Sequence, residues 1–160
     1  MKTLIATLLI TAAAQTAPAP ARSSAVSPLL GSWAVDVSRM PTPPTERPKS
    51  ATITFSDAGN GKWTTHVDIV YAVGSESHSV SHAALDGSAA PIKNSNEADT
   101  AALKLPAPNV LVMDLVRHGI PASTRVYTVA ADGKTMVETA SYVGSNGQPV
   151  MQTHYFTRIR

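Results

Sequence analysis

The sequence predicts an all-β domain whose antiparallel strands follow one another as an up-and-down meander and close into a small barrel of about eight to ten strands. Short runs rich in Val, Ile, Thr and aromatic residues alternate with Gly, Pro, Asn and Asp turn signals. The connections are too short for crossover helices, and no segment keeps a 3.6-residue apolar period. A β-sandwich is the alternative, but closure into a barrel would remove the exposed strand edges.

The bulk composition narrows the class of protein. A chain of 160 residues is long enough for one domain. It has no cysteine, which excludes disulfide bonds and thiolate metal sites. Its net charge is +2 and its charged residues, 15% of the chain, have interspersed signs. That surface offers no basic patch for nucleic acid or anionic lipid.

The first residues resemble a secretory leader. Lys2 precedes an uncharged apolar stretch over 4–14, and small residues at 12–14 and 19–21 offer cleavage sites. The stretch is about half of the ~20 residues that a membrane-spanning helix needs. A short buried helix or a retained anchor is the alternative. We therefore expect a periplasmic or secreted protein without a membrane span, organised as a signal peptide (1–21), a flexible arm (22–28) and a barrel domain (29–160).

In the first half of the domain, strands are predicted over residues 29–37, 51–55, 62–73 and 77–85. Between the first two lies the segment 40–50, which contains four prolines. Proline lacks a donor N–H and fixes φ, so this segment is expected to be an extended loop.

In the second half, residues 89–98 are expected to be irregular. Asp86-Gly87, Asp132-Gly133 and Asn146-Gly147 are expected to form type I′ hairpin turns, which need positive φ. The remaining strands are predicted over residues 100–105, 110–117, 123–130, 135–143 and 150–159.

The alternation of side chains in a strand places the late polar residues on shared faces. If Arg125 points inward it must pair, since an unpaired buried charge is costly. Its candidate partners are the Trp33 ring through a cation–π contact, a strand carboxylate, or a ligand carboxylate. The three predicted faces are Arg125, Tyr127 and Val129; Met136, Glu138, Ala140 and Tyr142; and His154, Phe156, Arg158 and Arg160.

The triplet Gly31-Ser32-Trp33 on the first strand, shortly after an exported leader, resembles the opening of lipocalins and related calycin barrels. The layout of residues 29–160 is similar to that of small bacterial exported lipocalin-like proteins. The resemblance implies that Gly31 and Trp33 are structural, that Trp33 packs across the closed end, and that Arg125, or alternatively Arg158, lies over its ring. The ending Thr157-Arg158-Ile159 also resembles the last strand of fatty-acid-binding proteins, in which an internal Arg meets a carboxylate.

The sequence contains no recognisable catalytic or metal-binding pattern. His78 and His82 share a strand face but would lie ~13 Å apart, too far to hold one ion. The strand carboxylates Asp68, Asp114 and Glu138 are expected to face solvent. There is no G-x-S-x-G elbow and no phosphate-binding loop. We assign no catalytic residue, no metal and no cofactor, and keep a hydrolase or isomerase as a lesser alternative.

The sequence favours non-enzymatic binding of a small apolar or amphipathic ligand inside the barrel. The alternative is an envelope interaction or structural protein, in which side chains fill the barrel and the proline-rich loop 40–50 docks a protein partner. Nucleic acid is not an expected partner. The expected ligand-binding residues are Trp63, Ile69, Tyr71, Val112, Arg125, Tyr127, Tyr142 and Phe156.

Overall fold

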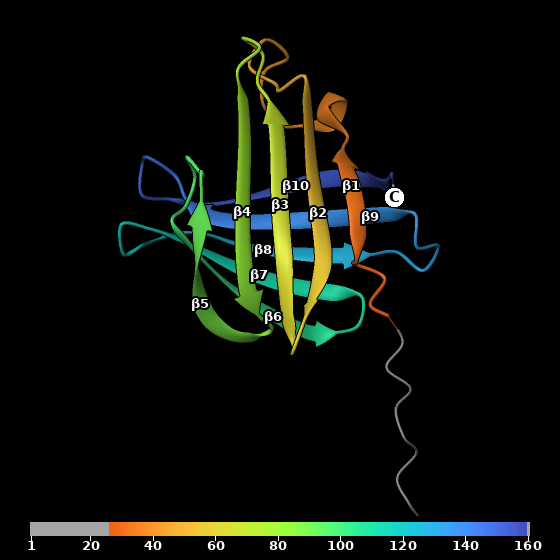
Figure 1. Ribbon diagram of the computed structural model, residues 1–160. Coiled ribbons are helices and arrows are strands. Elements are labelled where there is room, and N and C mark those ends of the chain that lie inside the picture. Colours follow the sequence, from red (N-terminus) through yellow and green to blue (C-terminus); the bar gives the residue numbers. More distant parts are fainter. Residues whose placement is uncertain (1–25, 160) are drawn as a thin grey trace, which may run out of the picture.

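The computed structural model describes residues 26–159, which form a closed barrel of antiparallel strands (Figure 1). The predicted fold class is confirmed. The signal peptide and residues 22–25 of the predicted arm lie outside the described residues. No helix within 26–159 is long and apolar enough to cross a membrane. The elements are β1 (Gly31–Val35), η1 (Val37–Arg39), β2 (Ser50–Gly59), β3 (Lys62–Val70), β4 (Glu76–Ala84), β5 (Asp86–Lys93), β6 (Thr100–Ala107), β7 (Val110–Arg117), β8 (Ile120–Val129), β9 (Thr135–Val143) and β10 (Pro149–Arg158).

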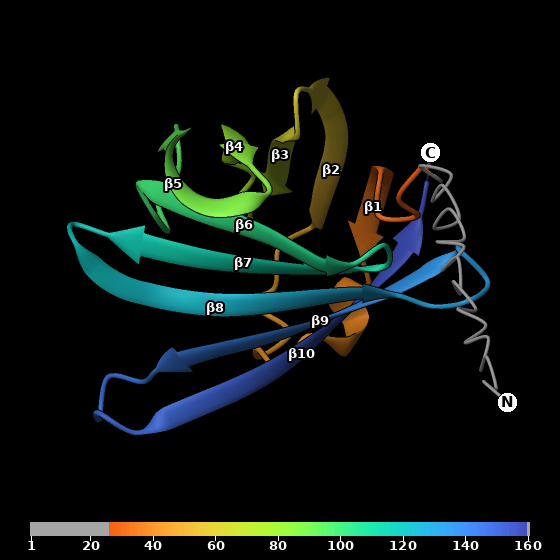
Figure 2. The same ribbon diagram turned by 90° about the horizontal axis from the view of Figure 1, so that it is seen from below.

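Each strand pairs with the next in the chain, and β1 pairs with β10 to complete the ring. Trp33 lies opposite Arg158 on β10 and opposite Ile53 on β2. Figures 1 and 2 show β1–β4 running across the direction of β6–β10, so the wall folds back over itself around one interior. The strands thus form one closed barrel and not the two stacked sheets of a β-sandwich, which was the alternative prediction.

The hairpin turns differ from expectation in their type. Asn60-Gly61 and His118-Gly119 have positive φ at both residues, as a type I′ turn requires. At Asp86-Gly87, Asp132-Gly133 and Asn146-Gly147 only the glycine has positive φ. The type I′ prediction for those three turns is therefore wrong, although each joins two antiparallel strands. Asp132 instead accepts hydrogen bonds from the backbone N–H groups of Lys134 and Thr135.

The prediction that residues 89–98 are irregular is wrong over its first half, because β5 continues to Lys93. This strand is poor in strand-forming residues and contains Pro91, which removes a ladder donor. It pairs with β4 at only two positions, Val80 with Lys93 and Ser81 with Ile92. β6 also runs past Pro106, which lies at a register shift between Lys104 and Ala107. Such bulges accommodate a missing N–H.

Trp33 is fully buried in the core of the barrel. Its indole N–H donates to the Leu29 carbonyl at 2.8 Å, and the Arg158 guanidinium carbon lies 4.1 Å from the ring centroid. Arg158 also donates to the carbonyls of Pro28, Leu30 and Gly133. The expected contact between an arginine and the Trp33 ring is therefore present. Its cationic partner is Arg158, and the choice of Arg125 is wrong.

Candidate ligand-binding site

A cavity of about 480 Å³ lies inside the barrel, between the buried core and the mouth. Its walls are built by alternation, since inward positions recur every second residue along a strand. On β3, for example, Thr65, Val67 and Ile69 line the cavity, whereas His66 and Asp68 between them are exposed. Further apolar wall residues are Ile53, Ile92, Ala101, Met113, Leu115, Tyr127 and Phe156.

The proline-rich segment between β1 and β2 lies at the mouth of this cavity. Met40, Thr42, Glu46 and Pro48 are among the lining residues. Arg47 folds the segment on itself by donating to the carbonyls of Thr42 at 2.8 Å and Ser38 at 2.6 Å. The segment is therefore part of the cavity wall, which fixed φ angles of proline help to hold in one shape.

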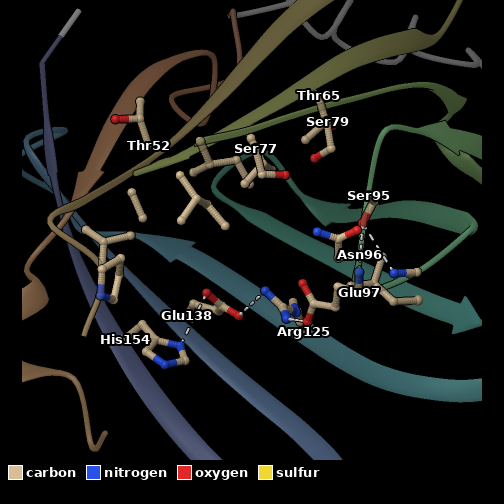
Figure 3. A pocket seen from close by; sticks show the side chains of 18 of the residues that line it. Thr52, Thr65, Ser77, Ser79, Ser95, Asn96, Glu97, Arg125, Glu138 and His154 are labelled. Atoms are coloured by element: carbon tan, nitrogen blue, oxygen red, sulfur yellow. Dashed lines mark hydrogen bonds and ion pairs between the residues drawn. The ribbon is translucent and has the colours of Figure 1, made fainter. Parts of the chain in front are cut away.

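A buried carboxylate, Glu138, occupies the wall formed by β8, β9 and β10. It is only 3% exposed and lies directly opposite Tyr127 on β8 and His154 on β10. One of its oxygens, Oε1, is 3.3 Å from Nη1 of Arg125, and the other, Oε2, is 3.5 Å from Nδ1 of His154 (Figure 3). The prediction that Glu138 faces solvent is wrong, because it shares its strand face with the buried Met136 and Ala140.

Arg125 points inward and pairs with two carboxylates. One is Glu138, and the other is Glu97 at the mouth, to which its Nη2 donates. Glu97 is held by a turn in which the Ser95 hydroxyl accepts the backbone N–H groups of Glu97 and Ala98. Of the three partners considered for Arg125, the structure selects a strand carboxylate and adds a loop carboxylate.

Two buried polar atoms that line the cavity lack a hydrogen-bond partner within residues 26–159. They are Oε1 of Glu138 and Oγ1 of Thr65. Oε1 lies close to Arg125, but the two groups are not aligned as a hydrogen bond. Buried polar atoms are nearly always paired in folded proteins, so these two atoms are the positions in the cavity wall that a bound donor would satisfy. Both side chains are seen at the cavity in Figure 3.

A row of aromatic side chains extends from the cavity wall into the core. The Tyr127 ring packs edge-on against Phe55 at 5.6 Å and Phe156 at 6.2 Å between centroids. Burial raises the pKa of Tyr127 far above its usual range, and the charge of Glu138 raises it further, while Arg125 opposes both effects. Tyr127 therefore stays a neutral phenol across the physiological range.

The structure brings together five of the eight expected ligand-binding residues at the cavity: Ile69, Tyr71, Arg125, Tyr127 and Phe156. The other three lie elsewhere. Trp63 is buried beside Phe55 in the core. Val112 alternates with the buried Leu111 and Met113 and thus faces outward. Tyr142 is the penultimate residue of β9, where the β9–β10 hairpin projects (Figure 2).

Sequence reasoning missed Glu46, Thr65, Glu97 and His154 as cavity residues. For Thr65 and His154 a signal existed, because each shares its strand face with apolar residues. Glu46 and Glu97 lie on connections, where no periodicity indicates orientation.

A second group of titratable residues lies on the outer surface. His78 contacts Asp68 at 2.7 Å and Glu76 at 3.2 Å, and all three side chains are exposed. Hydrogen bonds to Asp68 and then Glu76 raise the pKa of His78. His82 instead pairs with the Thr64 hydroxyl at 2.8 Å. In the described part of the chain, no group of three His, Asp or Glu side chains is arranged to hold a metal ion.

No family model matches the sequence, and no curated protein matches it. The closed antiparallel barrel is compatible with a lipocalin-like fold. Kinship with the bacterial lipocalin-like proteins remains a prediction from the Gly31-Ser32-Trp33 opening and the layout.

Proposed function

We propose that this barrel binds a small amphipathic ligand, with the apolar body of the ligand in the cavity and its polar group on the β8–β10 wall. The observation that carries the proposal is the cavity of about 480 Å³, which is within the range of small-molecule sites. Its walls are mostly apolar, and its polar groups converge on Glu138, as is typical of sites that orient a ligand.

The alternative of a filled barrel that docks a protein through the loop 40–50 is less well supported. It requires an interior packed by side chains, whereas the interior contains a cavity. The loop also contributes to the cavity wall. Binding is also favoured over a hydrolase or isomerase, although Glu97 and Glu138 both line the cavity. Both carboxylates form ion pairs with the guanidinium of Arg125, an arrangement that serves charge recognition without requiring a proton transfer.

The proposal includes export by the predicted signal peptide and a periplasmic or secreted location. Protein sequencing of the mature chain is expected to show a start just after Ala14 or Ala21. An intact Met1 on the functional protein would contradict export.

Binding can be tested with the neutral apolar fluorophore N-phenyl-1-naphthylamine. We expect saturable, one-to-one enhancement of its fluorescence, and competition by members of a panel of fatty acids, amines, retinoids and quinones. The variant Val67→Phe places a larger side chain in the cavity and should weaken binding at least tenfold. The matched control is His66→Phe, at the neighbouring position of β3, whose side chain lies on the outer face. This variant should leave binding unchanged.

Absence of saturable enhancement would refute the proposed function. Equal effects of Val67→Phe and His66→Phe would refute the cavity as the binding site. Circular dichroism of both variants establishes that each retains the barrel.

A further inference from the structure

The charges around the cavity favour one class of ligand head group. Resting on the proposed function, we propose that the polar group of the ligand is a cation, an alkyl- or arylalkyl-ammonium, which binds the Glu138 carboxylate. This differs from the carboxylate ligand that the inward Arg125 and the ending Thr157-Arg158-Ile159 had suggested.

The first argument is the balance of charge. Arg125 contributes one positive charge, and its two partners Glu97 and Glu138 contribute two negative charges. Arg125, Glu97 and Glu138 together therefore have a net charge of −1. Glu46 at the mouth adds another negative charge, and Arg125 and His154 are the only basic side chains among the described lining residues. A cationic ligand would neutralise this site, whereas an anionic one would add like charge in a poorly solvated space.

The second argument is the state of Arg125. A guanidinium that recognises a carboxylate ligand needs free N–H groups aimed at it, commonly as a bidentate pair. Here Nη1 lies against Glu138, Nη2 binds Glu97 and Nε donates to the Ser123 hydroxyl. All three guanidinium nitrogens thus already face oxygen atoms of the fold, so a ligand carboxylate would compete with Glu97 and Glu138 for Arg125.

The third argument comes from the unpartnered atoms. Oε1 of Glu138 is an acceptor buried at the cavity wall that faces the guanidinium of Arg125 at 3.3 Å without accepting an aligned hydrogen bond, and Oγ1 of Thr65, also buried, has no hydrogen-bond partner within residues 26–159 (Figure 3). An ammonium group brings two or three donors and no acceptor, so it supplies what a carboxylate oxygen lacks. A carboxylate brings acceptors only and cannot donate a hydrogen bond to Oε1 of Glu138.

The test compares ligands that share a body and differ in head group. Isothermal titration calorimetry at neutral pH would use octylamine, octan-1-ol and octanoate, and in parallel tryptamine, tryptophol and indole-3-propionate. We expect the amine of at least one series to bind at least tenfold more tightly than its alcohol, and the acid to bind most weakly. Octanoate or indole-3-propionate binding as tightly as its amine would overturn the inference and leave the proposed function intact. Failure of every compound and of N-phenyl-1-naphthylamine would refute the proposed function itself.

Two substitutions make the test specific for the named carboxylates. Glu138→Gln keeps the shape of the side chain but removes its charge, and should reduce amine affinity at least tenfold while leaving alcohol affinity within about twofold. Combining it with Glu97→Gln leaves Arg125 as an unpaired cation, so the double variant should prefer the acid over the amine. Because Glu97 is half exposed at the mouth, Glu97→Gln alone tests the charge argument without disturbing the core, and should reduce amine affinity several-fold. Unchanged amine affinity in all three variants would overturn the inference.

Discussion

Arg158 connects β10 to the segment that precedes β1, and its removal should lower the free energy of unfolding by a predictable amount. The residue lies near the end of β10, and its guanidinium donates to carbonyls of Pro28 and Leu30 before β1 and of Gly133 before β9. It also covers the ring of Trp33 at 4.1 Å. Arg158→Ala removes all of these contacts at once.

The magnitude follows from the contacts. A hydrogen bond from a charged donor contributes ~1.5–3 kcal/mol when buried, and a cation–π contact contributes about 0.5–2 kcal/mol. Arg158 is only partly buried, so water can replace part of each carbonyl interaction, and we take each bond at the lower end or below. The expected loss in the free energy of unfolding is about 3 kcal/mol, a large share of the ~5–15 kcal/mol typical of a domain.

The assay is urea unfolding followed by tryptophan fluorescence. With a slope of ~2 kcal/mol/M, the midpoint of Arg158→Ala should fall by ~1.5 M without a change in slope. Arg158→Lys keeps the charge but lacks the planar fork, and should recover less than half of the loss. Arg117→Ala, an exposed arginine at the end of β7, is the control and should change stability by ~0.5 kcal/mol at most. A decrease in the free energy of unfolding below about 1 kcal/mol in Arg158→Ala would refute this account of the Arg158 contacts.

Two further predictions concern protonation. Tyr127 should remain a neutral phenol above pH ~10, where an ordinary tyrosine ionises. Because the folded-state pKa of Tyr127 is raised, the free energy of unfolding should fall as pH rises from that value. Tyr127→Phe should remove this fall in urea unfolding measured as a function of pH, and an unchanged alkaline profile would contradict the prediction. Because the pKa of His78 is raised, its stabilising contribution is complete below pH ~6.5 and disappears as pH rises through the folded-state pKa. Asp68→Asn should bring that pKa back toward the ordinary value in an NMR titration. An unshifted titration would show that the contact with Asp68 is not the cause of the raised pKa.

Local patterns made most of the barrel predictable. The bounds 110–117 and 135–143 were predicted as the structure has them, because both strands are rich in branched residues and end at clear turn signals. β5 was missed because its residues have weak strand propensity and its pairing to β4 spans two positions. Its place is fixed by neighbouring strands and not by its own residues.

The candidate site was only partly predictable, for a similar reason. Period-two alternation placed Arg125 and Tyr127 on one face and Glu138 on another, but it did not show which face was inward. Glu97 is far from Arg125 in sequence and lies on a connection without periodicity, so no local pattern joins the two. The pairing of Trp33 was likewise left between two arginines until the register of β1 with β10 selected Arg158.

The sequence by itself determined a meander of antiparallel strands, the turns that separate most of them and the residues that share each strand face, because these depend on interactions between near neighbours. Only the tertiary structure decided how many strands close the ring, that a cavity remains inside it, and that Glu138 lies buried beside Arg125 and His154. Those features depend on which face of each strand turns inward and on contacts between segments that are distant in sequence. Both are decided only when the strands close into a barrel.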